Sequence, residues 1–579
     1  MNNQSVRAVS SNAKFDHIII GGGSAGCVLA SRLSEDPSLR VLLIEAGQDY
    51  DPGYGHPLSR DAAARSLFKP DFFWPDLTAE CPASDSPSGK GRVVPFSQAR
   101  IMGGGSSING MHAQRGVADD YDEWRQLGVV GWSWDEVMPH FKKLETDLDF
   151  TGEMHGADGP IPIKRVPVEQ WSPLSLALRG ALQRKGLPFL ADVNTESGDG
   201  FASVPLNGIE TRQSAASGYL TNKVRARSNL SILSDATVKR LCFSDRRVTG
   251  VELFGPGEDY IESANVVLCC GAIHSPALLL RSGIGDATAI NAAGLEVVAD
   301  LPGVGRNLQN HPMISISAHL SKAGRRRSKV RPACLMVTRF SSPGSEANTA
   351  DMILNLWERV PGGLATDPLG RQIADFMIIL NKGFSIGEVG LAPADPFGAP
   401  TVRANTLADP RDRHNMVEAF RMIGSLARSE AFDGLINDSF VLKPNAMMMD
   451  LLQDTRKARL LSEAGALALG GPAWLRRLLL RRATVPLENL LEDEAALEAH
   501  ILDNAQPGGH PGGTCRLGDP LDEATVVDSR CRVVGIEGLR VVDASIFPTL
   551  MRSGTNLPTM MAAEKAAVMI AEDAQRVYA

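Results

Sequence analysis

The sequence lacks any long apolar run near its start. Residues 1–14 are polar, and the first apolar stretch, residues 17–20, is far too short for the core of a signal peptide or for a membrane span. We therefore expect a cytoplasmic protein.

Paired cysteines and an excess of positive charge are also missing. The eight cysteines show no CxxC pair and no metal-ligand spacing, so we expect reduced, mostly structural thiols and no metal site. Lys plus Arg number 59 against 67 Asp plus Glu, a net charge of −8, which argues against nucleic acid as a partner and against a general affinity for anionic membranes. With 579 residues, 43% of them hydrophobic, the chain is expected to fold as two globular domains, which can be discontinuous in sequence.

A dinucleotide-binding motif follows the first apolar stretch. Residues 15–20 predict a buried strand, residues 21–26 read GGGSAG, and residues 27–33 have a helical pattern. In GxGxxG the first glycine, Gly21, permits the turn, Gly23 lets the backbone approach a pyrophosphate, and Gly26 lets helix and strand pack closely. A second strand, residues 41–44, ends in Glu45, at the spacing of a carboxylate that binds a ribose hydroxyl.

The same glycines contain GxSxG, with Ser24 in the position of a hydrolase nucleophile. A serine hydrolase is therefore an alternative. Such an elbow normally follows several earlier strands, whereas here it follows the first strand of the chain. Ser24 is more simply a small residue that lets the turn approach phosphate.

Four segments in the same order resemble signatures of the glucose-methanol-choline (GMC) oxidoreductases. Residues 99–110 read ARIMGGGSSING, and residues 271–285 read GAIHSPALLLRSGIG. Residues 302–312 read PGVGRNLQNHP, with Asn310 where the family usually has aspartate. Residues 538–548 read GLRVVDASIFP. Within the family, the sequence is most similar to bacterial alcohol dehydrogenases and hydroxymethylfurfural-type oxidases.

This resemblance implies an α/β fold with two domains. A Rossmann-like FAD-binding domain is expected from residues 1–165, 205–318 and 500–579, and a discontinuous α+β substrate-binding domain from residues 166–204 and 319–499. It implies FAD as the cofactor, held without a covalent bond because Ile108 occupies the position of the histidine that tethers FAD in some members. The implied cofactor-binding residues are Gly21, Gly23, Ser24, Ala25, Gly26, Glu45, Arg100, Gly103, Gly104, Ser107, Asn109, Gly110, Val238, Asp543, Ala544 and Asn556.

The catalytic residue implied by the resemblance is His510. Residues 510–518 read HPGGTCRLG, similar to the family's HPxGTCxMG segment. Oxidation of an alcohol requires a base for the hydroxyl proton, and a neutral imidazole suits that task near neutral pH. We interpret His274 and His311 as packing or loop residues.

The second polar residue of the family's catalytic pair is missing. An Asn or His that hydrogen-bonds the substrate oxygen usually lies about 44 residues after the base, and that position is Gly554. Either Asn556 or Arg552 reaches in from a shifted loop, or His510 and water hold the oxygen, or the chemistry differs. Gly508 and Gly509, where relatives often have a bulky aromatic residue, suggest room for a bulky alcohol.

The middle of the chain carries no catalytic motif. The basic run around residues 325–331 is interpreted as a solvated loop. Residues 460–483 predict two short amphipathic helices, which would form a lid or an oligomer contact more readily than they would enter a membrane interface.

These observations predict an FAD-dependent alcohol oxidase or dehydrogenase. A small-molecule alcohol, primary and possibly bulky or aromatic, would lose its proton to His510 and hydride to the flavin, which oxygen or another acceptor reoxidises. A redox-silent FAD lyase of the same family and a membrane-associated, quinone-dependent alcohol dehydrogenase remain alternatives.

Overall fold

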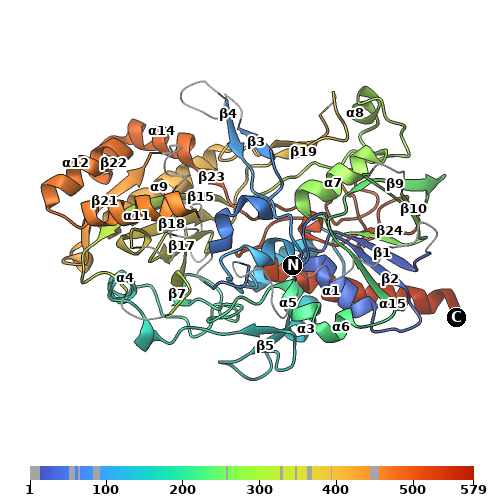
Figure 1. Ribbon diagram of the computed structural model, residues 1–579, viewed down its shortest axis with the longest axis horizontal. Coiled ribbons are helices and arrows are strands. Elements are labelled where there is room, and N and C mark those ends of the chain that lie inside the picture. The colour runs from blue at the N-terminus through green and yellow to red at the C-terminus, as the bar shows by residue number, and fades with distance from the viewer. Residues whose placement is uncertain are drawn as a thin grey trace.

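A five-stranded parallel sheet forms one half of the computed structural model (Figure 1). Its strand order is β24 (Leu539–Val541), β12 (Val266–Leu268), β1 (His17–Ile20), β2 (Val41–Ile44) and β8 (Leu230–Leu233). Strands β1 and β2 are buried at every residue, as expected for Val/Ile/Leu-rich parallel strands covered on both faces. The expected α/β, Rossmann-like fold is confirmed.

The structure describes residues 14–50, 59–62, 65–81, 91–255, 259–326, 330–343, 345, 349–360, 368–392, 394–443, 451 and 455–578.

Helices from both ends of the chain pack in this half. Helix α1 (Ser24–Leu33) lies against the long helix α15 (Asn556–Tyr578), and α7 (Gly271–Arg281) follows β12. The salt bridge between Arg32 and Glu564, with nitrogen and oxygen 2.7 Å apart, joins α1 to α15. The two termini of the sequence therefore contribute to one hydrophobic core.

The other half contains an antiparallel sheet, at the left of Figure 1. Its order is β22 (Thr484–Pro486), β21 (Ile436–Leu442), β15 (Pro312–Leu320), β18 (Ile373–Leu380), β17 (Met352–Trp357), β16 (Cys334–Phe340) and β7 (Gly200–Ser203), with β23 (Gln506–Pro507) paired to β15. Phe376 and Ile378 of β18 lie on the face that packs in the core with helix α9 (Pro410–Ala427). Alternate residues, including Asp375 of β18 and Trp357 of β17, lie on the opposite face of the sheet because side chains alternate along a strand.

The predicted domain division remains a prediction. Strand β15 begins at Pro312, so residues 312–318, expected in the FAD-binding domain, pair in the antiparallel sheet. Ile501 and Leu502 likewise pack in the core of the antiparallel half. The expected boundary at 318 therefore falls inside strand β15, and the boundary at 500 falls inside helix α14 (Glu494–Asn504), which packs in the same core.

Smaller elements surround the two large sheets. A four-stranded sheet has the order β19-β20-β3-β4 and a three-stranded sheet the order β11-β10-β9. Their strands are β3 (Thr78–Cys81), β4 (Arg92–Pro95), β9 (Val238–Ser244), β10 (Arg247–Leu253), β11 (Tyr260–Glu262), β19 (Glu388–Gly390) and β20 (Thr401–Arg403). The other short strands are β5 (Glu145–Asp147), β6 (Ile161–Ile163), β13 (Ile284–Gly285) and β14 (Ala299–Asp300). Further helices are α2 (Ala118–Gln126), α3 (Trp134–Leu144), α4 (Pro173–Arg184), α5 (Ala215–Tyr219), α6 (Asn222–Arg225), α8 (Ala287–Ala292), α11 (Arg456–Leu469), α12 (Ala473–Ala483), α13 (Leu487–Leu491) and α14 (Glu494–Asn504).

Candidate active site

The glycine motif forms the turn between β1 and α1. Gly21 has φ +99°, and a Cβ there would lie 2.5 Å from the carbonyl oxygen of Cys269. A Cβ at Gly26 would collide with the carbonyl oxygen of Gly21, so both glycines are required by close backbone packing. Gly23 differs, because its Cβ would meet nothing nearer than 3.8 Å. Open space therefore lies in front of the N-terminus of α1, which suits a pyrophosphate.

Glu45 directly follows β2 and lies beside this turn. Its carboxylate accepts hydrogen bonds from the backbone N–H groups of Gly22 and Gly47, both at 2.7 Å. Burial raises the pKa of Glu45 to about 7, although these two hydrogen bonds oppose the shift. The residue predicted to bind ribose is therefore already held rigidly against the glycine turn.

The glycine-serine loop, residues 103–110, lies directly against the first glycine turn. The Gly103 N–H donates to the carbonyl oxygen of Gly22 at 2.6 Å, and a Cβ at Gly104 would lie 2.8 Å from the Cα of Gly23. Only glycine permits this approach, since Gly103 and Gly104 also have positive φ. The Ser107 hydroxyl donates to the carbonyl of Met102 at 2.8 Å. Two segments 80 residues apart thus form one continuous surface of backbone groups.

The end of this loop is fixed by a buried arginine. The Asn109 Oδ1 accepts from Nη1 of Arg212 at 2.6 Å and from the backbone N–H of Met111 at 3.0 Å. Burial lowers the pKa of Arg212 to about 9. Gly110, the next residue of the loop, contacts the antiparallel half of the molecule, since a Cβ there would lie 3.2 Å from the indole of Trp357.

The C-terminal motif meets the same region. The carboxylate of Asp543 accepts from the Gly271 N–H at 2.9 Å and from the Ser275 hydroxyl at 2.6 Å. Burial raises the pKa of Asp543. The adjacent Ala544 accepts a hydrogen bond from the N–H of Gly513, three residues after His510. The second signature and the catalytic segment are therefore tied together through residues 543 and 544.

Two predicted cofactor residues remain at the edge of this surface. The Arg100 Nε donates to the carbonyl of Ala46 at 3.1 Å, beside Glu45. Val238 begins β9 and is buried. Their predicted contacts to the cofactor remain predictions.

Ser24 has no hydrolase geometry. Its hydroxyl donates to Oδ1 of Asn556 at 2.7 Å, at the start of α15, and not to a histidine. Ser24 joins the N-terminus of α1 to the N-terminus of α15, next to Ala25 of the same motif. The hydrolase alternative is therefore not supported.

His510 lies in direct contact with a second histidine. The Nδ1 atoms of His510 and His311 are 3.0 Å apart, and the strand pairing of β23 with β15 brings the two segments together. Burial lowers the pKa of His510 to about 4 and the pKa of His311 well below its ordinary value. Both rings are consequently neutral near pH 7, and His311 is more than the packing residue expected from the sequence. His274, in contrast, packs on Trp74 with ring centroids 4.3 Å apart.

The side chain of Asn310 holds the backbone of both histidines. Its Oδ1 accepts from the N–H of His311 at 2.9 Å and from the N–H of His510 at 3.2 Å. One side-chain oxygen thus fixes both backbone segments that carry the histidines.

Position 554 faces the free nitrogen of His510. A Cβ at Gly554 would lie 3.2 Å from Nε2 of His510. Arg552 does not take this place, because its guanidinium donates to Oδ1 of Asp120 at 2.6 Å, and Asn556 bonds to Ser24 as described. The alternative in which either residue replaces the missing side chain is therefore not supported.

The two glycines before His510 have different roles. A Cβ at Gly508 would collide with the carbonyl oxygen of His311, so this glycine permits the β15–β23 approach and is not a pocket wall. A Cβ at Gly509 would meet nothing within 4 Å. The suggestion of extra space therefore depends on Gly509 alone.

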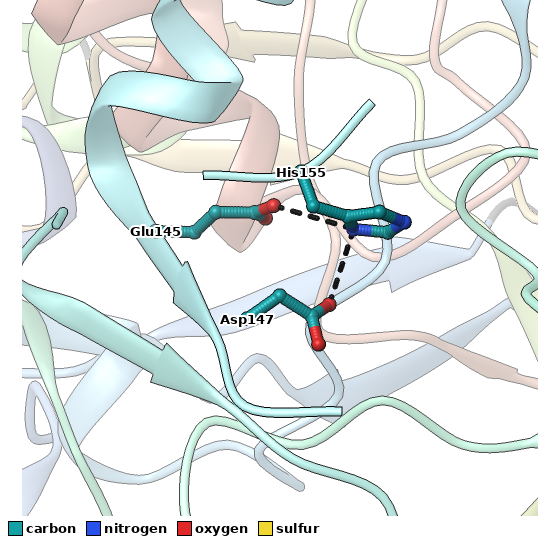
Figure 2. Close-up of side chains that lie close together, drawn as sticks. All are labelled: Glu145, Asp147 and His155. Carbon is teal, nitrogen blue, oxygen red and sulfur yellow. Dashed lines mark ion pairs between the residues drawn. The ribbon is translucent and has the colours of Figure 1, made fainter. Parts of the chain in front are cut away.

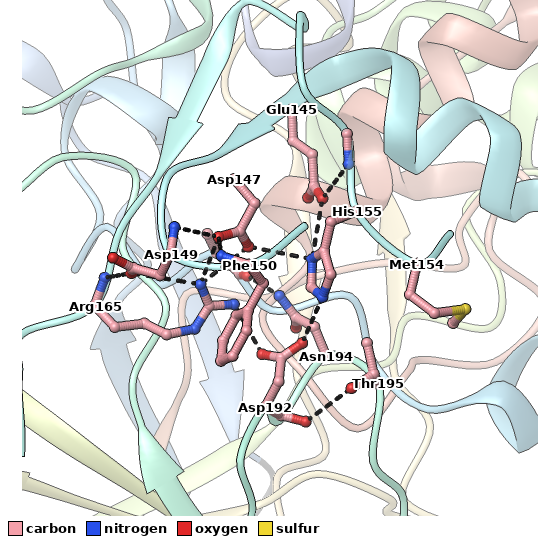
Figure 3. A network of polar contacts seen from close by, with 12 residues as sticks. Glu145, Asp147, Asp149, Phe150, Met154, His155, Arg165, Asp192, Asn194 and Thr195 are labelled. Carbon is pink, nitrogen blue, oxygen red and sulfur yellow. Dashed lines mark hydrogen bonds and ion pairs between the residues drawn. The ribbon is translucent and has the colours of Figure 1, made fainter. Parts of the chain in front are cut away.

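A separate cluster has the chemistry of a metal site. Ligand atoms of Glu145, Asp147 and His155 lie within 4.8 Å of one another (Figure 2). Two arginines already occupy these carboxylates. Arg165 donates to Asp147 at 2.9 Å (Figure 3), and Arg115 forms a buried salt bridge with Glu145.

We interpret this cluster as an ion-pair network. Arg165 also donates to Asp192 at 2.8 Å, which joins β5 to the segment at residues 192–195 (Figure 3). Arg115 bonds Glu145 of β5 and so joins this strand to the segment that follows the glycine-serine loop. Neutralisation of the carboxylates by arginine removes the demand for a cation.

The segment at 460–483 forms two helices, as predicted, with α11 beginning four residues earlier. Helix α12 is fixed to β21 by Arg476, whose Nε donates to Asp438 at 2.7 Å. Trp474 on α12 is 68% exposed. Both helices lie at the end of the molecule far from the parallel sheet (Figure 1). Part of the basic run, residues 327–329, lies outside the described residues.

No described helix is long and apolar enough to cross a membrane.

Comparison with known families matches residues 15–313 to the N-terminal part, and residues 384–563 to the C-terminal part, of the GMC oxidoreductases. The chain is 39% identical to a 5-(hydroxymethyl)furfural oxidase of Methylovorus sp. (strain MP688) over 96% of this chain and 98% of the relative. It is 30% identical to the mitochondrial choline dehydrogenase of Homo sapiens over 97% and 90%. Among solved structures, pyridoxine 4-oxidase from Mesorbium loti matches with a TM-score of 0.78 at 27% identity, over 96% of this chain and 99% of that chain.

Proposed function

The chain belongs to the GMC oxidoreductase family, and from this premise we propose that it oxidises a primary alcohol, bulky or aromatic, with His510 as the base. The protein is an FAD-dependent oxidoreductase that acts on the CH–OH group of small-molecule alcohols. The observation that carries the proposal is the pairing of His510 with His311, which leaves one nitrogen of His510 free beside Gly554.

His510 is prepared for proton removal by its neighbours. Its lowered pKa keeps the imidazole neutral, as a general base requires. The proton between the two facing Nδ1 atoms belongs to one of the two rings. We propose that His510 carries it on Nδ1, because a general base needs the lone pair on its other nitrogen. Its Nε2 then carries a lone pair, directed toward position 554, that accepts the proton of the substrate hydroxyl.

The residues of the two glycine loops fit FAD. Gly23 and the uncapped N-terminus of α1 leave open space for a pyrophosphate, and Glu45 lies at the end of β2 for a ribose hydroxyl. When bound, FAD supplies the hydride acceptor. We propose that the cofactor is held without a covalent bond, since Ile108 offers no nucleophile.

The absent side chain at Gly554 determines what approaches His510. Residue 554 has no side chain at the position where a Cβ would lie 3.2 Å from Nε2, so a substrate carbon with a bulky substituent can take this place. Gly509, where a Cβ would also meet open space, directly precedes His510. This supports a bulky or aromatic primary alcohol.

We propose oxygen as the electron acceptor, on the basis of the 39% identity to a 5-(hydroxymethyl)furfural oxidase over nearly the full length of both chains. A quinone remains the second candidate, because the relative at 30% identity is named a dehydrogenase and not an oxidase.

Anaerobic mixing with 5-(hydroxymethyl)furfural and with benzyl alcohol tests the proposal. Bleaching of the flavin absorbance is expected with at least one of them, followed by fast reoxidation when oxygen is admitted. A flavin that stays oxidised with every primary alcohol would contradict alcohol oxidation and favour the lyase alternative. Slow reoxidation by oxygen, together with fast reoxidation by a soluble quinone, would contradict the proposed acceptor only.

A further inference from the structure

We propose that Trp357 and His112 together bind a carbonyl oxygen that the alcohol substrate carries away from its reacting carbon. The inference rests on the proposed alcohol oxidation and adds a chemical feature to the substrate. The carbonyl oxygen would lie beside Gly110, between the glycine-serine loop and the antiparallel sheet.

Trp357 presents an unused hydrogen-bond donor. It is the last residue of β17 and is 7% exposed. Its Nε1 is buried and has no hydrogen-bond partner among the residues that the structure describes. An indole N–H can only donate, and a buried donor without an acceptor is costly, so such groups are normally satisfied by a partner.

His112 presents a second unused nitrogen next to the first. Its Nε2 is buried and likewise lacks a partner within the described part of the chain. The ring lies roughly parallel to the indole of Trp357, with an interplanar angle of 21° and centroids 6.2 Å apart. Burial lowers the pKa of His112 to about 4, so the ring is neutral near pH 7 and can carry its proton on Nε2.

Both rings lie against Gly110. A Cβ at Gly110 would lie 3.2 Å from Cη2 and 3.3 Å from Cζ2 of Trp357, and 3.8 Å from Cδ2 of His112. Cδ2 is bonded to Nε2, and Cζ2 is separated from Nε1 by one ring carbon. Nε2 of His112 is therefore one bond, and Nε1 of Trp357 two bonds, from an atom that borders this glycine.

His112 also lies near the proposed base. Burial is the main cause of the lowered pKa of His112, and the charge of His510 adds to it, so the two imidazoles are within electrostatic reach of each other. A carbonyl oxygen has two lone pairs and can accept from both donors at once. A substrate with its hydroxymethyl group at His510 and a carbonyl at Trp357 and His112 would satisfy all three nitrogens.

The test compares two alcohols of the same shape. 4-(Hydroxymethyl)acetophenone has a carbonyl where 4-isopropenylbenzyl alcohol has a CH₂ group, and the two meta isomers provide a second pair. Flavin reduction is followed anaerobically, and each rate is divided by that of benzyl alcohol with the same enzyme. Electronic effects of the substituent cancel when this ketone-to-alkene ratio is compared between variants.

The wild type is expected to prefer the ketone in at least one pair. Trp357→Phe and His112→Phe leave an aromatic ring at each position without the nitrogens, and each should lower the ketone-to-alkene ratio about tenfold, the value of one hydrogen bond. Trp474→Phe removes an indole N–H from the exposed surface of α12 and should leave the ratio unchanged.

Three results would overturn the inference. The first is a wild-type enzyme without preference for either ketone, and the second is a ratio that stays unchanged in both ring variants. The third is a shift of the flavin absorbance in the variants with an unchanged ratio, which would assign the donors to the cofactor. Failure of benzyl alcohol to reduce the wild-type flavin would instead contradict the aromatic-alcohol proposal itself.

Discussion

Substitution of Gly554 tests the geometry around the proposed base most directly. In Gly554→Ala the new methyl carbon would lie 3.2 Å from Nε2 of His510. A substrate hydroxyl must approach that nitrogen to about 2.6–3.2 Å for proton transfer. The methyl group therefore competes for the place of the substrate oxygen. Since a misplacement of about 1 Å can cost roughly 100-fold, we expect flavin reduction to slow by about tenfold or more.

Gly554→Asn adds a hydrogen-bond donor to the same steric change. The amide can bond the developing alkoxide of a small alcohol, and a hydrogen bond to a charged group contributes about 1.5–3 kcal/mol, or roughly 10- to 150-fold. A small primary alcohol should therefore be oxidised far faster by the Asn variant than by the Ala variant, and at least as fast as by the wild type. A bulky aromatic alcohol should be impaired by both.

The measurement is the anaerobic rate of flavin reduction, with butan-1-ol as the small alcohol and the best aromatic alcohol as the bulky one. The Asn-to-Ala ratio removes the steric effect that both variants share, and bound FAD per protein serves as the control for folding. Unchanged rates in Gly554→Ala with both alcohols would refute the placement of the substrate at position 554. Equal rates in the Asn and Ala variants would refute the hydrogen bond alone.

His510→Ala should retain FAD and lose about 100-fold or more in flavin reduction, because it removes the base but leaves the dinucleotide site intact; a near-normal rate would remove His510 from the mechanism. Glu45→Ala should lower FAD occupancy on gel filtration, with little change in the reduction rate per bound flavin, and full retention of FAD would show that Glu45 does not hold the ribose. Asn310→Asp places a carboxylate beside both histidine segments and should raise the pKa of His510 from about 4, so that the fall in reduction rate at acidic pH begins at higher pH; an unshifted profile would separate this residue from the base. Glu145→Leu leaves Arg115 buried without its partner and should lower the free energy of unfolding by about 3–5 kcal/mol in urea titrations, whereas an unaffected midpoint would contradict the ion-pair interpretation.

The cofactor motif could be predicted because its information is local. Gly21, Gly23 and Gly26 follow one strand and begin one helix. Close backbone contacts demand glycine at 21 and 26, whereas Gly23 borders the open space in front of the helix. The periodicity of the flanking residues then indicated strand and helix. Glu45 follows from the same βαβ spacing, and the structure adds only its two backbone hydrogen bonds.

The catalytic environment depended on contacts between distant segments. The sequence predicts a packing or loop residue at His311, yet its Nδ1 lies 3.0 Å from Nδ1 of His510, 199 positions away, because β23 pairs with β15. The sequence does not distinguish Gly508 from Gly509. In the structure Gly508 permits a close backbone approach, whereas Gly509 borders open space. Neither His112 nor Trp357 belongs to a motif that would have indicated a site.

The sequence by itself determined the family, the cofactor and the identity of the proposed base, since these depend on short motifs whose residue types and spacing are fixed by backbone geometry and chemistry. Only the tertiary structure decided which nitrogen of His510 faces Gly554, that neither Arg552 nor Asn556 replaces the side chain absent there, and which rings border Gly110. These features arise from long-range strand pairing and from burial. Both depend on which distant segments the folded chain brings into contact, and no local pattern in the chain encodes that arrangement.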